Sequence, residues 1–156
     1  MGGATLNALM LGALALLLVS AGIQDARTRE IANWKNAAIA LTAPLWWWSN
    51  GLFLWPDLGI HLGIAVGVFV LFLVPFYFGW MGGGDVKMIG ALALWFPLQG
   101  LLWMLIMMSL LGGALTLLMI IERAVRRNTE IEVPYGVAIA IAALISLPEP
   151  FLNHFL

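Results

Sequence analysis

Apolar stretches long enough to cross a lipid bilayer recur along most of this chain. A transmembrane helix needs about 20 mostly apolar residues to cross a hydrocarbon core of about 30 Å. Six apolar segments meet or approach that length, and they cover residues 4–23, 37–55, 58–80, 86–96, 100–121 and 133–147. Only 10% of the residues are charged, whereas soluble domains carry about 25%. We therefore expect an all-α polytopic membrane protein, a six-transmembrane-helix bundle that forms one domain over residues 1–156.

The positive charges predict how the bundle is oriented. With six crossings, all seven basic residues fall in loops on one side of the membrane: Arg27, Arg29, Lys35, Lys87, Arg123, Arg126 and Arg127. Lysine and arginine are enriched in cytoplasmic loops, so we expect this side to face the cytoplasm and both termini to lie outside. The fourth and sixth segments are short for a full crossing, but the fourth is needed to keep Lys87 on the basic side. Four tryptophans lie near the outer ends of helices two and three, on the side away from the basic loops: Trp46, Trp47, Trp48 and Trp55. We expect them to anchor these helices at the membrane–water interface.

Composition excludes several kinds of chemistry. The chain has no cysteine, which rules out disulfides, zinc–thiolate sites and thiol catalysis. Its net charge of −1 gives no reason to expect a nucleic-acid partner. His61 and His154 fall toward the outer face, away from the acidic residues of the basic side, so we expect neither a catalytic histidine nor a metal site there. No cofactor is expected.

Two polar clusters on the cytoplasmic side carry the candidate chemistry. The first, residues 25–36, contains Asp25, Arg29 and Asn33, and the second, residues 82–87, contains Asp85. Topology places the two aspartates at similar depth. An acid at the membrane survives only where it faces water or a partner. Two facing carboxyls suit shared-proton chemistry, in which one stays ionised and activates water while the other stays protonated and polarises a carbonyl.

The residues around Asp85 allow two interpretations. Gly82, Gly83 and Gly84 remove side-chain bulk, so a substrate backbone can come close to the acid. The simpler alternative is a flexible turn in which Asp85 is the N-cap of the next helix. Lys87 either holds Asp85 in its ionised form, contacts substrate, or is only a charge that sets topology. Asp25 taken alone is more typical of an interfacial acid paired with Arg27 or Arg29; the two clusters together favour a shared site.

Three segments resemble the type IV prepilin peptidase family. Asp25, followed by Arg29, Ile31 and Asn33, is similar to the first aspartate motif of that family. Residues 82–87 fit its Gly-x-Gly-Asp motif with the following lysine. A third segment, residues 133–136, contains Pro134, Tyr135 and Gly136 and resembles the family at the start of the last helix.

The resemblance implies an intramembrane aspartyl endopeptidase with six helices. Such an enzyme removes the leader of type IV prepilins or pseudopilins at the cytoplasmic membrane face, usually after a glycine. By resemblance Asp25 and Asp85 are the catalytic pair, and the other motif residues shape the site or bind substrate: Arg29, Asn33, Gly82, Gly83, Gly84, Lys87, Pro134, Tyr135 and Gly136. The implied location is the inner membrane, and the implied partners are the prepilin and the lipid bilayer; the oligomeric state is not predicted.

The chain departs from the family in two ways. Ala32 stands where the family often has proline, which affects only the rigidity of the loop. The first cytoplasmic loop is short and lacks the cysteines of the bifunctional members, so we expect a peptidase without N-methyltransferase activity, similar to the short enzymes of tight-adherence (Flp) pilus systems. Short archaeal preflagellin peptidases share the aspartate motifs.

Two other classes of function remain open from the residues alone. A small proton- or cation-coupled transporter would use Asp25 and Asp85 as membrane acids, but it predicts acids near the midplane and repeated halves, and the sequence shows neither. A non-catalytic assembly subunit would need no pair of interfacial aspartates. For the peptidase, we expect both acids to line one cytoplasm-facing cavity bounded by helices one and four and by residues 134–136. The carboxyls need not share a proton until substrate draws them together.

Overall fold

A computed structural model describes residues 2–51, 55–126 and 133–147. This part of the chain forms six α-helices and no strand, which confirms the predicted all-α bundle. The helices are α1 (Gly2–Thr28), α2 (Asn33–Ser49), α3 (Asp57–Tyr77), α4 (Gly83–Ala93), α5 (Leu98–Arg126) and α6 (Tyr135–Ser146). The expected outer position of the C-terminus and of His154 falls outside the described residues.

The helices begin and end at different residues from the apolar segments that predict them. α1 continues past residue 23 to Thr28 and so carries Asp25 on a helix rather than in a loop. α2 begins at Asn33 instead of residue 37, and α5 continues to Arg126 inside a stretch that we expected to be a loop. Hydropathy marks only the apolar part of a helix, whereas glutamine, arginine and glutamate are good helix formers. The polar end of α1 and the polar start of α2 therefore belong to helices, and these helices carry Asp25 and Asn36.

Three helices are long and apolar enough to cross a membrane, over Thr5–Thr28, Asp57–Tyr77 and Leu98–Glu122. The other three are shorter, with 17 residues in α2, 11 in α4 and 12 in α6. At a rise of about 1.5 Å per residue, α4 is roughly 16 Å long, about half the hydrocarbon thickness. The structure thus supports a membrane protein, while six complete crossings remain a prediction.

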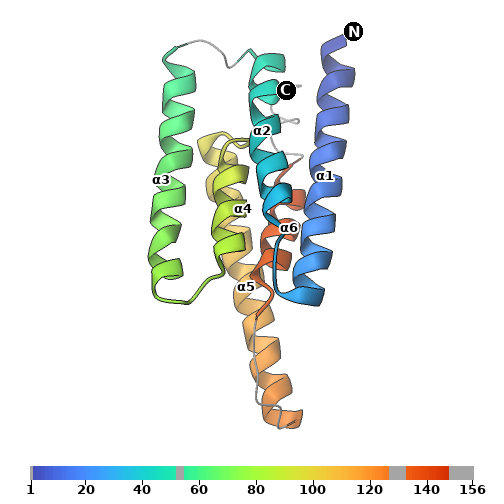
Figure 1. Cartoon of the computed structure of the whole chain (residues 1–156), viewed down its shortest axis with the longest axis vertical. Helices are drawn as coiled ribbons and strands as arrows, with labels where there is room; N and C mark the ends of the chain where they lie inside the picture. The colour runs from blue at the N-terminus through green and yellow to red at the C-terminus, as the bar shows by residue number, and fades with distance from the viewer. Residues whose placement is uncertain (1, 52–54, 127–132, 148–156) are drawn as a thin grey trace.

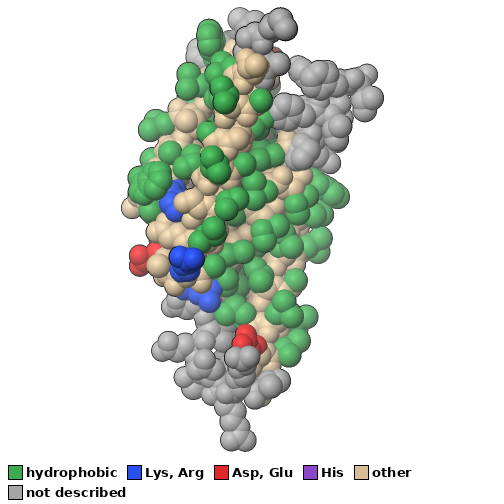
Figure 2. Space-filling view, turned by 90° about the vertical axis from the view of Figure 1, so that its right-hand side faces the viewer, with side chains coloured by type: hydrophobic (Ala, Val, Ile, Leu, Met, Phe, Trp, Pro, Cys, Tyr) green, Lys and Arg blue, Asp and Glu red, His purple; other side chains and the backbone are tan. Residues whose placement is uncertain are grey.

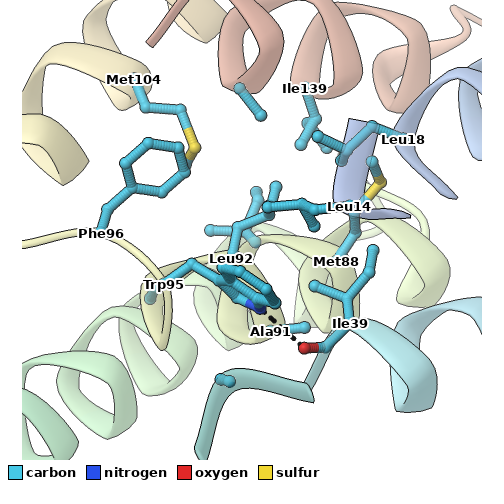
Figure 3. Packing of buried hydrophobic residues seen from close by; sticks show 14 of the residues in the cluster. Leu14, Leu18, Ile39, Met88, Ala91, Leu92, Trp95, Phe96, Met104 and Ile139 are labelled. Carbon is cyan, nitrogen blue, oxygen red and sulfur yellow. Dashed lines mark hydrogen bonds between the residues drawn. The ribbon is translucent and has the colours of Figure 1, made fainter. Parts of the chain in front are cut away.

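The short helix α4 lies at the centre of the bundle. It packs against α2, α3 and α6, and most of its side chains are buried. Met88 and Leu92 of α4 meet Leu14 of α1, Ile39 of α2 and Ile139 of α6 (Figure 3). Lipid tails are as apolar as these side chains, so packing contacts rather than escape from water hold the helices together. The position of α4 therefore depends on its neighbours on several sides.

The tryptophans do not all behave as interfacial anchors. Trp48 and Trp55 are exposed, as expected, but Trp46 and Trp47 are only 7% and 6% exposed and belong to the core. The indole N–H of Trp47 donates a hydrogen bond to the carbonyl oxygen of Leu94 at 2.6 Å. The prediction was wrong for these two because consecutive residues of a helix point about 100° apart, so a run of tryptophans cannot all face lipid.

Helix ends with polar motifs meet at one end of the bundle. In Figure 1 the C-terminal end of α1 and the N-terminal ends of α4 and α6 lie toward the same end, and α5 extends beyond them. α6 packs against both α1 and α4. Figure 2 shows the complementary surface pattern, with hydrophobic side chains over most of the visible face and lysines and arginines gathered toward that end.

Candidate active site

The position of Asp25 is fixed by the last turn of α1. It lies in the last turn of the helix, and its carbonyl oxygen accepts the backbone N–H of Arg29 at 2.9 Å. Arg29 has a φ of 57°, in the left-handed region that only a few per cent of non-glycine residues adopt. This residue ends the helix and reverses the chain, so that Ile31 returns into the core and α2 begins two residues later.

The carboxyl of Asp25 fits against the start of α6. Oδ2 accepts the backbone N–H of Val137 at 3.2 Å, and only 4% of the residue is exposed. The N–H groups at the start of a helix favour a negative charge, and that of Val137 is shared between Asp25 and the carbonyl oxygen of Pro134, at 3.1 Å. Gly136 makes the approach possible, because a Cβ atom there would lie 2.8 Å from both Cγ and Oδ2 of Asp25. The third segment, expected only to border the site, thus supports Asp25 directly.

Asp85 lies in the first turn of α4 and is 8% exposed. The N-cap of α4 is Gly82, which is extended and makes no side-chain cap hydrogen bond. The alternative in which Asp85 is the N-cap residue is therefore wrong: Asp85 is the third residue of the helix, and its carboxyl lies beside the backbone N–H of Gly82. A Cβ atom at Gly82 would lie 3.1 Å from Oδ2 of Asp85, so the carboxyl folds back over the glycine backbone.

The other two glycines allow close helix packing. A Cβ atom at Gly83 would lie 3.2 Å from the ring of Phe76, and one at Gly84 would lie 3.2 Å from Cβ of Ile31 and 3.4 Å from its backbone nitrogen. The glycine run therefore sits between α3 and the turn after α1. In this structure the glycines bring Asp85 close to the Asp25 turn, in addition to leaving room for a ligand.

Two adjoining cavities lie at the aspartates, and both are lined by Asp25, Arg29, Gly82 and Asp85. The first has a volume of about 290 Å³ and is also lined by Glu30, Ile31, Asn33, Gly83 and Gly84. The second has a volume of about 420 Å³ and is also lined by Gly79, Trp80, Met81, Val133 and Tyr135. Both acids thus line the same cavities, as expected, but there are two cavities instead of one, and of residues 134–136 only Tyr135 lines them. The side of the membrane that the cavities face stays a prediction.

The remaining motif residues occupy different places. Lys87 donates a hydrogen bond to Oδ1 of Asn33 at 2.8 Å, which ties α4 to the start of α2 rather than to Asp85. Pro134 is the N-cap of α6. The ring of Tyr135 packs on Gly112 of α5, where a Cβ atom would lie 2.7 Å from it. Their roles in catalysis or substrate binding stay predictions.

Residues outside the motifs also contribute. Glu30 and Ile31 line the smaller cavity, and Asn36 donates a hydrogen bond to the carbonyl oxygen of Gly84 at 3.0 Å. Sequence reasoning could have found Glu30 from its position next to Arg29, but Asn36 gave no signal beyond its place in a polar cluster.

His61 bonds the carbonyl oxygen of Leu94 and lines neither cavity. Among the described residues no group of three His, Cys, Asp or Glu side chains is placed to hold a metal ion.

A model of the type IV leader peptidase family matches residues 12–117, which is more than half of the chain and includes Asp25, the glycine run and Asp85. The match ends before Pro134 and Gly136, so the support that α6 gives to Asp25 rests on the structure alone. No curated protein and no solved structure matches the chain.

Proposed function

The chain belongs to the type IV leader peptidase family, and from that premise we propose that it is an intramembrane aspartyl endopeptidase. Its proposed substrates are prepilins or pseudopilins of the type IV (Flp) class, whose leader peptide it removes at the cytoplasmic face of the inner membrane. The membership supports a peptidase; the aspartyl mechanism, the substrate and the face are the parts that we propose.

One observation carries the mechanism. Asp25 and Asp85 come from helices 60 residues apart in sequence, yet both are buried and line the same two cavities. A buried carboxyl needs a partner or a function, since an ion is costly to remove from water. Arg29 lies near Asp25 and lines both cavities, but a single cation cannot balance two buried carboxylates, so a structural ion pair does not account for the arrangement.

The surroundings of the two acids suggest different roles. Asp25 accepts a backbone N–H at the start of α6, and such a bond favours the ionised carboxylate. The carboxyl of Asp85 has the backbone N–H of Gly82 beside it, whereas Asp25 has backbone N–H groups of α6 and the charge of Arg29 near it. A second negative charge beside Asp25 is unfavourable, so the proton is expected on Asp85. We assign Asp25 as the group that takes a proton from water and Asp85 as the protonated group that polarises the scissile carbonyl.

The reaction then balances without any other group. Water attacks the carbonyl carbon and gives a proton to Asp25, while Asp85 gives its proton to the carbonyl oxygen. The resulting diol breaks its C–N bond as Asp25 passes its proton to the leaving nitrogen, and a hydroxyl proton returns to Asp85. One water molecule is consumed, and the products are a carboxylic acid and an amine. The short turn after α1 leaves no room for a methyltransferase region there, so the proposed activity is cleavage alone.

The test is reconstitution of the purified protein in lipid vesicles with a small membrane protein that carries a basic leader ending in glycine. We expect a new product whose mass corresponds to cleavage after that glycine. The Asp85→Asn variant should insert equally well and give no product. Absence of cleavage together with a proton or cation flux that requires Asp25 and Asp85 would instead establish the transporter alternative and refute the proposal.

A further inference from the structure

Asn36 is a buried amide next to the candidate site, and its environment is unusual. It lies in the first turn of α2 and is only 4% exposed. Its side-chain nitrogen, Nδ2, donates a hydrogen bond to the carbonyl oxygen of Gly84, the residue immediately before Asp85, at 3.0 Å. Its side-chain oxygen, Oδ1, is buried without a hydrogen-bond partner, the one such side-chain atom found in the described part of the chain.

The orientation of the amide follows from its partner. A backbone carbonyl oxygen can only accept, so the nitrogen of Asn36 must face Gly84 and the oxygen must point away. Rotating the amide to satisfy the oxygen would place two acceptors against each other. A buried acceptor without a donor costs stability. The fold therefore retains the bond to Gly84 even though the other half of the same amide remains unsatisfied.

Gly84 has no side chain by which the bundle could hold it. Its α-carbon packs against Ile31 on one side, where a Cβ atom would be 3.2 Å away, and its carbonyl oxygen is held by Asn36. Ile31 follows the turn that ends α1, and that turn carries Asp25. Ile31 and Asn36 thus fix the peptide of Gly84 relative to Asp25, and the peptide in turn sets where the backbone of Asp85 begins.

We propose, on the basis of the proposed peptidase function, that Asn36 is a positioning residue that holds the Gly84 peptide and so sets the carboxyl of Asp85 against that of Asp25. It does not contact the reacting atoms. The donor, Nδ2, performs this role, whereas the unpaired acceptor, Oδ1, lowers the stability of the fold. Positioning and stability consequently make opposite demands on the same side chain.

Two substitutions separate these demands. Asn36→Leu has a similar size, removes the donor and also removes the unsatisfied acceptor, so thermal stability should be unchanged or higher. Asn36→Asp keeps the size but places a carboxylate oxygen against the Gly84 carbonyl, so stability should fall. Both should lower kcat by roughly ten- to hundredfold, because small displacements of a catalytic group are that damaging. KM should stay within about twofold, since Asn36 lines neither of the cavities at the aspartates and a lost positioning contact lowers kcat.

Asn7 offers a matched control at the other end of the bundle. Its amide donates to Asn50 at 3.2 Å and accepts from the hydroxyl of Ser49 at 2.6 Å, so both halves of it are satisfied. Asn7→Leu should lower the thermal midpoint and leave kcat unchanged. If kcat follows the thermal midpoint across the Asn36 and Asn7 variants, Asn36 is merely structural and the proposal is wrong.

A geometric measurement tests the proposal even if no substrate is cleaved. The chain has no cysteine, so an Asp25→Cys/Asp85→Cys protein can be treated with bifunctional thiol reagents of increasing length. The shortest reagent that links the two cysteines should link them less efficiently once Asn36→Leu is added, and longer reagents should link them more efficiently. Unchanged linking would overturn the positioning role. If no preparation cleaves substrate but Asn36→Leu still changes which reagents link the pair, the peptidase function is refuted and the positioning role stands.

Discussion

The contact between Gly136 and Asp25 makes a demanding test of the site. Gly136 is the second residue of α6, and a Cβ atom there would lie 2.8 Å from Cγ and Oδ2 of Asp25 and 2.7 Å from Cδ1 of Ile31. Carbon atoms attract best at about 3.5–4.0 Å. The substitution Gly136→Ala therefore has to push the carboxyl of Asp25 back by about 0.7 Å or more, away from the N–H of Val137 that it accepts at 3.2 Å.

Stability and activity should respond to this change very differently. Alanine in place of glycine stabilises a helix by about 0.5–1 kcal/mol, whereas overpacking costs about 1–3 kcal/mol. The atoms in the way are ends of side chains that can rotate, so the net loss should not exceed about 2 kcal/mol. A misplacement of about 1 Å at a catalytic group can cost about a hundredfold in rate. We therefore expect a folded, inserted protein whose kcat is roughly ten- to hundredfold lower.

Gly113→Ala is the matched control, since it lies in α5 and a Cβ atom there meets nothing within 4 Å. The assay is cleavage of a leader-bearing substrate by both variants at equal amounts of inserted protein, with thermal midpoints measured in the same detergent. The control should cleave normally. If Gly136→Ala cleaves as fast as Gly113→Ala, Asp25 does not act from the position that the structure gives it.

Two further outcomes follow from the chain as a whole. Cleavage should survive chelators, thiol reagents and serine-directed inhibitors, since an aspartyl mechanism uses only two carboxyls and water; a loss that a chelator causes and added metal restores would contradict it. Reporter fusions at Asn50 and Asn128 should report opposite sides of the membrane, as the distribution of lysine and arginine predicts, and equal signals from both would contradict the topology.

The helix count could be predicted from the sequence, but the internal order of the bundle could not. The lengths of the apolar segments and the distribution of lysine and arginine were enough to separate six helices. α4 and α3 are both apolar, yet α4 is surrounded by other helices whereas α3 exposes most of its side chains. Hydropathy does not distinguish lipid from a neighbouring helix, because both are equally apolar. The same ambiguity explains why Trp46 and Trp47 were assigned to the interface.

Some features of the candidate site could also be predicted from the sequence, and others could not. Pairing of Asp25 with Asp85 could be predicted because topology places both at one end of the helices, and the resemblance added the segment before α6. The contact of Asp25 with Gly136 depends on how closely α1 and α6 approach, which no local pattern encodes. The bond from Asn36 to Gly84 joins residues 48 apart through a backbone atom, and a backbone acceptor leaves no trace in the sequence. These supporting contacts emerge only from the packing of the helices.

The central claim is that Asp25 and Asp85 act as one unit, and kcat for three variants tests it most directly. Asp25→Asn, Asp85→Asn and the double variant are compared at equal levels of inserted protein. The account predicts that each single substitution reduces cleavage to background and that the double variant is no slower, since residues acting as a unit are far from additive. A single variant that retains a rate within about tenfold of the unmodified protein would contradict it.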